Sequence, residues 1–240
     1  MYRGEGVMVL TEWGSGGVKA LRDQAAVLVI VDVLSFSTAV DVAVSSGAVV
    51  YPFPYGDEDA AQAAAERVGA VLAKPRRSSV GQFSLSPQSL MAVPAGTRIM
   101  LPSPNGALLS LACGDRPVLT GCLRNAAAVA RMARQIANGG PVGVVPAGER
   151  WPDGSLRPAI EDLLGAGAII HHLALTCSPE AEVALNAFRG ARTDVGRLIR
   201  TSVSGRELIE RGFTSDVDLA VELEVSMRAP LFAGGAYRAV

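Results

Sequence analysis

Short apolar runs alternate with amphipathic stretches along most of the chain. The apolar runs predict β-strands at residues 26–32, 48–53, 70–73, 98–101, 117–119 and 142–146. The stretches between them predict helices near residues 38–46, 57–68, 106–113 and 125–137. Strands that alternate with helices are typical of an α/β fold. We therefore predict a three-layer α/β/α arrangement around a mostly parallel or mixed central sheet.

From about residue 158 the pattern becomes mostly helical. Ser178 and Pro179 have the residue types that start a helix, and "SGRE" at 204–207 and "SDVD" at 215–218 resemble capping boxes. The acidic residues of the last two segments are interpreted as capping groups. The final segment "APLFAGGAYRAV" is expected to return one or two strands to the sheet. Because no repeat and no long linker is seen, we predict one domain over residues 1–240.

The composition narrows the class of protein. Hydrophobic residues make up 49% and charged residues 19% of the 240 positions, which is typical of a globular chain. The formal net charge of −1 gives no electrostatic basis for binding nucleic acid or an anionic membrane. The N-terminal residues lack the apolar core of a signal peptide, and no run reaches the ~20 apolar residues of a membrane span. We expect a cytoplasmic protein.

The run "VLVIVDVLSFSTAV" at 27–40 places a carboxylate, Asp32, at the end of a buried strand. An unpaired buried carboxylate is costly, so Asp32 requires partners. One interpretation is structural: Ser37 and Thr38 cap the following helix, where Thr38 and Asp41 form a capping pattern, and Asp32 accepts hydrogen bonds from the loop. The other is functional: Asp32 binds a divalent cation or accepts protons beside a helix start that holds an anion.

Three further strand ends carry polar or glycine-containing loops, and ligands of α/β sheets bind beyond such ends. Arg76 and Arg77 begin the loop 76–87, which is either an anion-binding segment or an ordinary solvated loop. Asn105 and Gly106 form a hairpin signal, but the residues that follow look helical. There Gly106 would let the backbone approach a ligand closely.

The loop 146–162 is the richest in acidic groups. Glu149 and Arg150 follow a strand, and Glu161 and Asp162 follow Pro158. Carboxylates in the first turn of a helix are favoured by the helix dipole alone. Glu149, Glu161 and Asp162 also have the oxygen ligands that Mg²⁺ prefers, and they are candidates to join Asp32 around one ion.

Several chemistries are disfavoured by what the sequence lacks. His171 and His172 are neighbours in one apolar helix, so they point ~100° apart and do not form a chelating pair. The three cysteines form no CxxC pair, which argues against a zinc site. Neither GxxxxGK[ST] nor GxGxxG is present. These absences disfavour Ser-His-Asp catalysis and the common nucleotide-binding folds.

Taken in order, six segments resemble the 2-phosphosulfolactate phosphatase family, which comprises magnesium-dependent acid phosphatases linked to coenzyme M synthesis. The segments are "VIVDVLSFSTAVDVAVSSGA", "GQFSLSP", "PNGALLSL", "GCLRNAAAVA", "PAGERWPDGSLRPAIEDLLGAGAII" and "SGRELIERGFTSDVDLAVELEVS". The resemblance implies a three-layer α/β/α fold, bound Mg²⁺ and hydrolysis of a phosphate ester on a small hydroxy acid. The family's strand-end aspartate falls on Asp32, its Asn-Gly loop on Asn105 and Gly106, its later asparagine on Asn125 and its acidic pair on Glu161 and Asp162.

We therefore predict a cytoplasmic, Mg²⁺-dependent phosphatase of a small phosphorylated acid, with a homodimer as the expected assembly. The predicted catalytic groups are Asp32, Glu149 and Arg150, and the predicted metal ligands are Asp32, Glu161 and Asp162. The predicted substrate-binding residues are Ser37, Thr38, Arg76, Arg77, Asn105, Gly106 and Asn125. The alternative is a non-catalytic module that binds small phosphorylated or sulfonated acids on the same scaffold.

One departure from the family concerns substrate binding. Ser35 stands where the family usually carries arginine, so a two-pronged contact to an anionic group is missing at this position. Arg76, Arg77 and Arg150 are candidates to compensate from neighbouring loops. Without such compensation, Ser35→Arg is expected to improve hydrolysis of 2-phosphosulfolactate.

Overall fold

The computed structural model describes residue 6, residues 8–76 and residues 83–240, so Arg77 lies outside the described residues. Each strand and helix predicted between residues 26 and 146 is present, with bounds that differ by a few residues. The strands of the main sheet are β1 (Val9–Thr11), β2 (Val27–Val31), β3 (Val49–Pro54), β4 (Val71–Leu72), β5 (Arg98–Ser103), β6 (Val118–Gly121), β7 (Val142–Pro146), β10 (Pro230–Ala233) and β11 (Ala236–Ala239).

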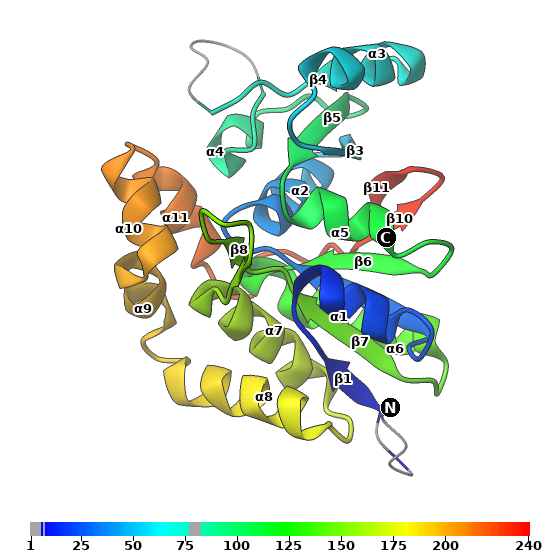
Figure 1. Cartoon of the computed structure of the whole chain (residues 1–240), viewed down its shortest axis with the longest axis vertical. Coiled ribbons are helices and arrows are strands. Elements are labelled where there is room, and N and C mark those ends of the chain that lie inside the picture. Colours follow the sequence, from blue (N-terminus) through cyan, green and yellow to red (C-terminus); the bar gives the residue numbers. More distant parts are fainter. Residues whose placement is uncertain (1–5, 7, 77–82) are drawn as a thin grey trace.

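The nine strands form one mixed, mostly parallel sheet in the order β1-β7-β2-β6-β10-β11-β3-β5-β4 (Figure 1). Strands β1, β7, β2 and β6 are parallel to one another, and so are β3, β5 and β4. The C-terminal hairpin β10–β11 lies between these two groups and pairs antiparallel with both. Three successive antiparallel pairings reverse the direction, so the two parallel groups run opposite to each other. The prediction that the C-terminal segment returns strands to the sheet is confirmed.

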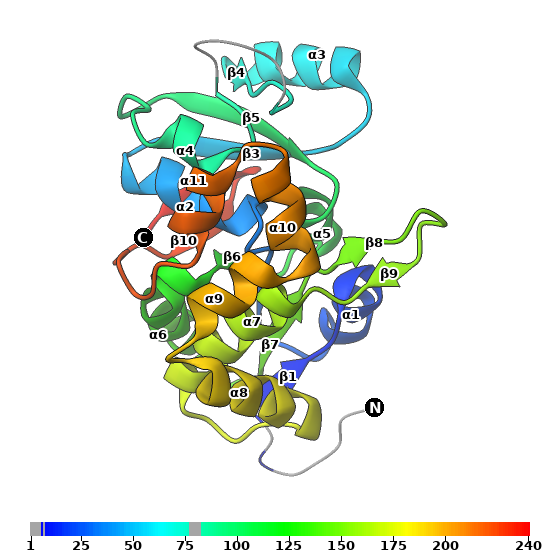
Figure 2. The ribbon, with the colours of Figure 1, turned by 90° about the vertical axis from the view of Figure 1, so that its left-hand side faces the viewer.

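Helices cover both faces of the sheet, as the fold prediction requires. In the first half of the chain they are α1 (Gly14–Leu21), α2 (Phe36–Ser45), α3 (Glu58–Val68), α4 (Pro87–Leu90), α5 (Gly106–Ala112) and α6 (Ala126–Ala137), the last preceded by the 3₁₀ turn η1 (Leu123–Asn125). The predicted helix-rich part follows, with α7 (Ile160–Leu173), α8 (Pro179–Ala191), α9 (Val195–Thr201), α10 (Val203–Glu210) and α11 (Thr214–Ala220). A small hairpin of β8 (Glu149–Arg150) and β9 (Leu156–Arg157) projects beside α1 (Figure 2).

Alternating side chains of β2 show why the central strand is apolar throughout. Val27, Val29 and Val31 pack into the core that α6, α7 and α8 cover. Leu28 and Ile30 point to the opposite face and pack with residues of α1 and α5. A strand buried on both faces has no polar side, which matches the continuous apolar run in the sequence.

The other parallel group has its own two layers. One face of β3 and β5 packs on α2, through residues such as Val50 and Ile99. The other face packs on α3, through Met100 and Tyr51. Helix α2 also contacts β6 and the hairpin β10–β11, so it joins the two parallel groups. The predicted single-domain organisation over residues 1–240 stays a prediction.

Some local predictions are wrong. The segment that forms β1 and α1 has no predicted element, because "GSGG" at 14–17 is poor in helix formers. The cap of α10 is Ser202, whose side chain accepts the N–H of Gly205 (3.1 Å), so the predicted capping serine lies inside the helix. Helix α11 starts at Thr214 without a side-chain cap. The prediction for Ser178 is confirmed, since it accepts the N–H of Ala181.

Candidate active site

Asp32 directly follows β2 and is held by the starts of two helices. Its Oδ1 accepts the backbone N–H of Phe36 (3.2 Å), and its Oδ2 accepts that of Gly106 (2.8 Å). The side chain is only 5% exposed. Burial, with a smaller contribution from the nearby charge of Glu161, raises the pKa of Asp32 to about 6, although both hydrogen bonds act in the opposite direction. The buried carboxylate therefore has backbone partners, as the structural interpretation expected, and it is also an unusually weak acid.

Gly106 is required at this position by close packing. A Cβ atom there would lie 2.3 Å from a ring carbon of Phe36. Only glycine lets the start of α5 approach α2 closely enough for its N–H to reach Asp32. The backbone at Gly106 thus makes a close approach, and the groups that it approaches are the Asp32 carboxylate and the Phe36 ring of α2.

Asp162, in the first turn of α7, is the second buried carboxylate. Its Oδ1 accepts the N–H of Val33 (2.7 Å), and its Oδ2 accepts the N–H of Gly148 (2.8 Å). Burial first, and then the charge of Asp32, raise its pKa well above the ordinary range. Its neighbour Glu161 is also buried. The first turn of α7 thus brings two acidic groups to the end of β2.

Glu149 starts β8 and lies within electrostatic range of Asp32. The side-chain amide of Asn105 donates to its Oε2 (3.0 Å), which joins the β5–α5 turn to the β8–β9 hairpin. Burial, followed by the charge of Asp32, raises the pKa of Glu149 to about 7. A carboxyl group with a pKa near neutrality can both donate and accept a proton at physiological pH.

Arg76 reaches from the chain after β4 to the start of α2. Its Nη2 donates to Oγ of Ser35 in a short contact and to the carbonyl of Leu85 (3.2 Å). Its Nε lies 3.5 Å from Oδ2 of Asp216, and the side chain is 17% exposed. A guanidinium therefore does occupy the neighbourhood of Ser35, supplied by Arg76. We therefore do not expect Ser35→Arg to improve activity, because Arg76 already occupies the space beside the buried Ser35.

A cavity of about 510 Å³ adjoins these groups. Among the described residues that line it, the four cations are Arg76, Arg150, Arg157 and Arg211, and the acids are Glu149 and Glu207. The remaining lining residues are Leu34, Trp151, Pro152, Val203, Ser204 and Leu208. Convergent guanidinium groups favour small ligands with more than one anionic group. The cavity thus places four guanidinium groups and the Glu149 carboxyl group, whose pKa is raised to about 7, along one lining.

Described residues from all four polar strand-end loops contact one another here, but not every predicted residue lines the cavity. Ser37 and Thr38 are fully buried. The Ser37 hydroxyl accepts the N–H of Asp32 (2.8 Å), and the Thr38 hydroxyl donates to the carbonyl of Val33 (2.7 Å). Neither residue is among the described residues that line the cavity, and Thr38 does not cap α2.

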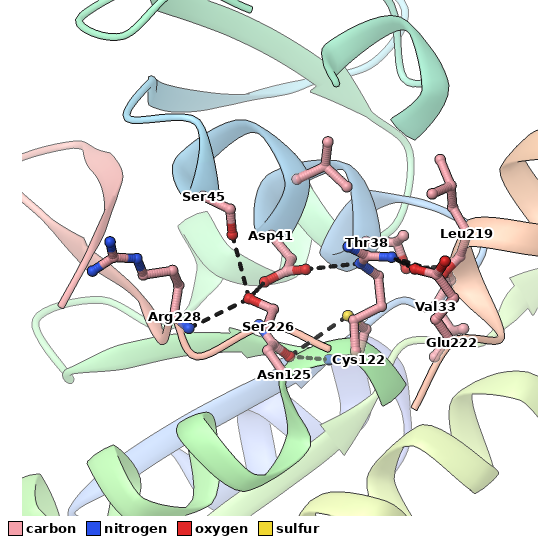
Figure 3. A network of polar contacts seen from close by, with 12 residues as sticks. Val33, Thr38, Asp41, Ser45, Cys122, Asn125, Leu219, Glu222, Ser226 and Arg228 are labelled. Atoms are coloured by element: carbon pink, nitrogen blue, oxygen red, sulfur yellow. Dashed lines mark hydrogen bonds and ion pairs between the residues drawn. The ribbon is translucent and has the colours of Figure 1, made fainter. Parts of the chain in front are cut away.

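Asn125 lies in a separate buried polar network with Asp41, Cys122 and Ser226 (Figure 3). Its Oδ1 accepts the N–H of Cys122 (2.9 Å). In the same network Asp41 accepts from Nε of Arg124 (3.0 Å) and from the hydroxyl of Ser226 (2.6 Å). This network ties α2 to the segment after α11, which gives Asn125 a structural environment here.

Sequence reasoning missed the contribution of α10 and α11. Arg211 and Glu207 line the cavity from this pair of helices, and Asp216 holds Arg76. Arg157, on β9, was also missed. The only available signal was the segment "SDVD", which matches a capping pattern equally well. A short polar segment cannot reveal which distant cation it pairs with.

The match to a family model decides the affiliation. A model described as 2-phosphosulpholactate phosphatase matches residues 18–234. The chain belongs to this family. It is 33% identical over 147 residues to a Deinococcus radiodurans protein named "Probable 2-phosphosulfolactate phosphatase", with 59% of this chain and 58% of the relative covered. It is also 33% identical over 140 residues to the "2-phosphosulfolactate phosphatase" of Methanothermobacter thermautotrophicus, with 58% of each chain covered. The matched segment thus spans little more than half of each relative.

The family resemblance implies a bound Mg²⁺ ion, and the acidic residues around Asp32 are the candidate ligands. Within residues 8–76 and 83–240, no group of three or more Asp, Glu, His or Cys side chains is arranged to hold a metal ion. Mg²⁺, however, is commonly held by only one or two carboxylates together with waters and substrate phosphate oxygens. Burial is the main cause of the raised pKa values of Asp32 and Asp162, and neighbouring carboxylates add a smaller repulsion that a divalent cation would relieve. The donor set therefore fits a substrate-assisted Mg²⁺ site.

No helix in the described part of the chain combines the length and apolar character that crossing a bilayer requires.

Proposed function

We propose that this chain is a 2-phosphosulfolactate phosphatase that hydrolyses the phosphate monoester of a small acidic substrate. The observation that carries the proposal is the cavity that Arg76, Arg157 and Arg211 line together with Glu149, where Arg157 also pairs with Glu207 (3.5 Å). Family membership supports the same reaction class. An anionic ester bound by the guanidinium groups would lie next to a carboxyl group whose pKa is about 7.

The arginines bind and orient the ester, and they balance the charge of the phosphoryl oxygens. Arg150 also lines the cavity, with its Nη1 donating to the carbonyl of Gly154 (3.2 Å). As the water oxygen bonds to phosphorus, the ester P–O bond breaks, and protonated Glu149 donates its proton to the leaving alkoxide oxygen. The proton released by the water restores Glu149. Asn105 keeps the Glu149 side chain oriented through its Oε2.

Mg²⁺ dependence is part of the proposal. Asp32 together with Glu161 or Asp162 would hold the ion, which would offset the negative charge of the phosphoryl group when bound. The absence of a chelating histidine pair and the oxygen donors of this region favour Mg²⁺ or Mn²⁺ over Zn²⁺. A role in coenzyme M synthesis, a cytoplasmic location and a homodimer stay predictions.

The test is phosphate release from 2-phosphosulfolactate and from a phosphomonoester of an uncharged alcohol, each assayed after EDTA treatment and after adding back Mg²⁺ or Zn²⁺. We expect Mg²⁺-dependent turnover with a clear preference for the acidic ester. Arg157→Gln should raise KM, because Arg157 lines the cavity, whereas Arg200→Gln on the exposed Asp218 pair should not. Binding of the ester without release of phosphate would instead indicate the non-catalytic module.

A further inference from the structure

Asp216 is a buried carboxylate whose burial is not explained by its position in α11. It lies in the first turn of α11, where an exposed acid would be favoured by the helix dipole, but it is only 1% exposed. Its Oδ1 accepts from the hydroxyl of Ser86 and from the N–H of Gln88 (3.2 Å), both outside α11. Its Oδ2 faces Nε of Arg76 at 3.5 Å. A buried carboxylate needs a partner of this kind, and Arg76 is the cation that it meets.

Arg76 is held on several sides in return. Nε faces Asp216, Nη2 donates to Ser35 and to Leu85, and the ring of Phe213 lies 5.4 Å from the guanidinium carbon. These contacts with described residues involve Nε and Nη2 and not Nη1, and Arg76 lines both the cavity of about 510 Å³ and a second one of about 490 Å³. A planar guanidinium fixed at one edge presents its other edge in a defined direction.

We propose that Asp216 is a positioning residue that holds the Arg76 guanidinium toward the cavity and so sets the affinity for the anionic group of the substrate. The proposal rests on the function proposed above. Asp216 acts through Arg76 and does not touch the substrate. It makes α11, a helix more than a hundred residues away along the chain, part of the anion-binding site.

The experiment compares wild-type protein with Asp216→Asn and with the matched control Asp218→Asn. Asp218 is on the same helix and pairs with Arg200 (3.0 Å), but it is exposed and away from Arg76. The affinity for inorganic phosphate is measured by titration calorimetry, and KM and kcat are measured with 2-phosphosulfolactate. We expect Asp216→Asn to weaken phosphate binding and to raise KM by about tenfold, because the fixed charge opposite Arg76 is lost. The value of kcat should change much less, and Asp218→Asn should match wild type.

Repeating the comparison in an Arg76→Gln background distinguishes positioning of Arg76 by Asp216 from a merely structural role of Asp216. If Asp216 acts through Arg76, Asp216→Asn has no further effect on phosphate affinity there. The same factor of loss in both backgrounds, or wild-type affinity in the Asp216→Asn protein, would overturn the proposal. Wild-type protein that binds no phosphate would overturn it too, since Arg76 would then clamp no anion.

The phosphate titration does not depend on turnover, so failure of the two proposals can be told apart. A protein that binds phosphate but hydrolyses no ester refutes the proposed function, while the Asp216→Asn titration still decides the positioning role. If Asp216→Asn does not fold, Ser86→Ala replaces it, because this variant keeps the carboxylate but removes one of its anchors. Ser86→Ala should weaken phosphate binding by about threefold when Arg76 is present and should have no effect in the Arg76→Gln background. Unchanged phosphate affinity in the presence of Arg76 would contradict the proposal.

Discussion

Replacing Glu149 with glutamine should make the protein more stable at pH 8 while it impairs turnover. In the wild-type protein the side-chain amide of Asn105 donates a hydrogen bond to Oε2 of Glu149 (3.0 Å). The glutamine side chain keeps an oxygen that can accept this hydrogen bond, but it lacks the carboxylate charge. In the wild-type fold that charge is unfavourable, because burial and then the charge of Asp32 raise the pKa of Glu149 from 4.5 to about 7. The variant therefore isolates the free-energy cost of ionising this group in the folded protein.

The sign follows from proton uptake. A carboxyl group whose pKa is higher in the folded state binds more protons there, so stability is highest below pH 4.5 and falls as the pH rises to 7. A shift from 4.5 to about 7 corresponds to up to about 3 kcal/mol at pH 8. Asp32, whose pKa is also raised, contributes a fall of the same sign and is retained in the variant.

The assay is urea unfolding of wild type and Glu149→Gln, without added metal, at intervals from pH 4 to pH 8. The two free energies of unfolding should agree near pH 4 and diverge above it, with the variant more stable by up to about 3 kcal/mol at pH 8. Glu58→Gln, which removes an exposed carboxylate paired with Lys74 (3.3 Å), is the control and should follow the wild-type profile. Parallel profiles for wild type and Glu149→Gln would refute the reasoning. In the phosphatase assay, kcat of Glu149→Gln should fall by about 10²–10⁴-fold.

Three further substitutions test the same site. Asp32→Asn should abolish Mg²⁺-dependent phosphate release, and unchanged hydrolysis by the folded variant would exclude Asp32 from the chemistry. Its free energy of unfolding at pH 8 should change by less than about 3 kcal/mol, because one backbone N–H loses its acceptor while an unfavourable buried charge is removed. Gly106→Ala should lower Tm by several degrees, because the added Cβ would lie 2.3 Å from Phe36, and an unchanged Tm in a thermal melt would show that α5 can shift freely. Ser35→Arg should raise KM instead of lowering it, because the new guanidinium would meet that of Arg76 at a site only 2% exposed; a lower KM would show that two guanidinium groups fit.

The sequence predicted the elements of the fold where one physical signal was strong. The apolar run of β2 and the alternating strands and helices up to residue 146 depend on burial patterns that are local in the chain. The segment 14–21 escaped prediction because its helix is stabilised by packing of Val18 and Leu21, not by propensity. The strand order was also beyond the sequence, since the hairpin β10–β11 is inserted between strands that precede it by more than a hundred residues.

The candidate site also shows that a sequence pattern predicts local features but not contacts between distant segments. Asp32 and Glu149 were candidates because each follows a strand, and Asp162 because it follows Pro158 at a helix start; their roles stay predictions. The substrate-binding role of Ser37 stays a prediction, because in the sequence a hydroxyl next to a strand end looks the same whether it binds a ligand or, as in this structure, accepts the N–H of Asp32. Asp216 was not a candidate in the sequence, because its only visible feature is a helix-start position and its contact with Arg76 is formed by the fold.

The insertion of β10 and β11 into the middle of the sheet has a consequence for synthesis on the ribosome. The neighbours of this hairpin, β6 and β3, are both translated long before residue 230, so the nascent chain carries two unpaired strand edges until the hairpin emerges. These edges hold apolar residues such as Val50 and Leu119, and unpaired edges of this kind invite association with other chains. A ribosome that stops before this hairpin would therefore release an aggregation-prone product with an open sheet. Rapid translation of the hairpin, or a chaperone that shields the two edges, would favour the native fold.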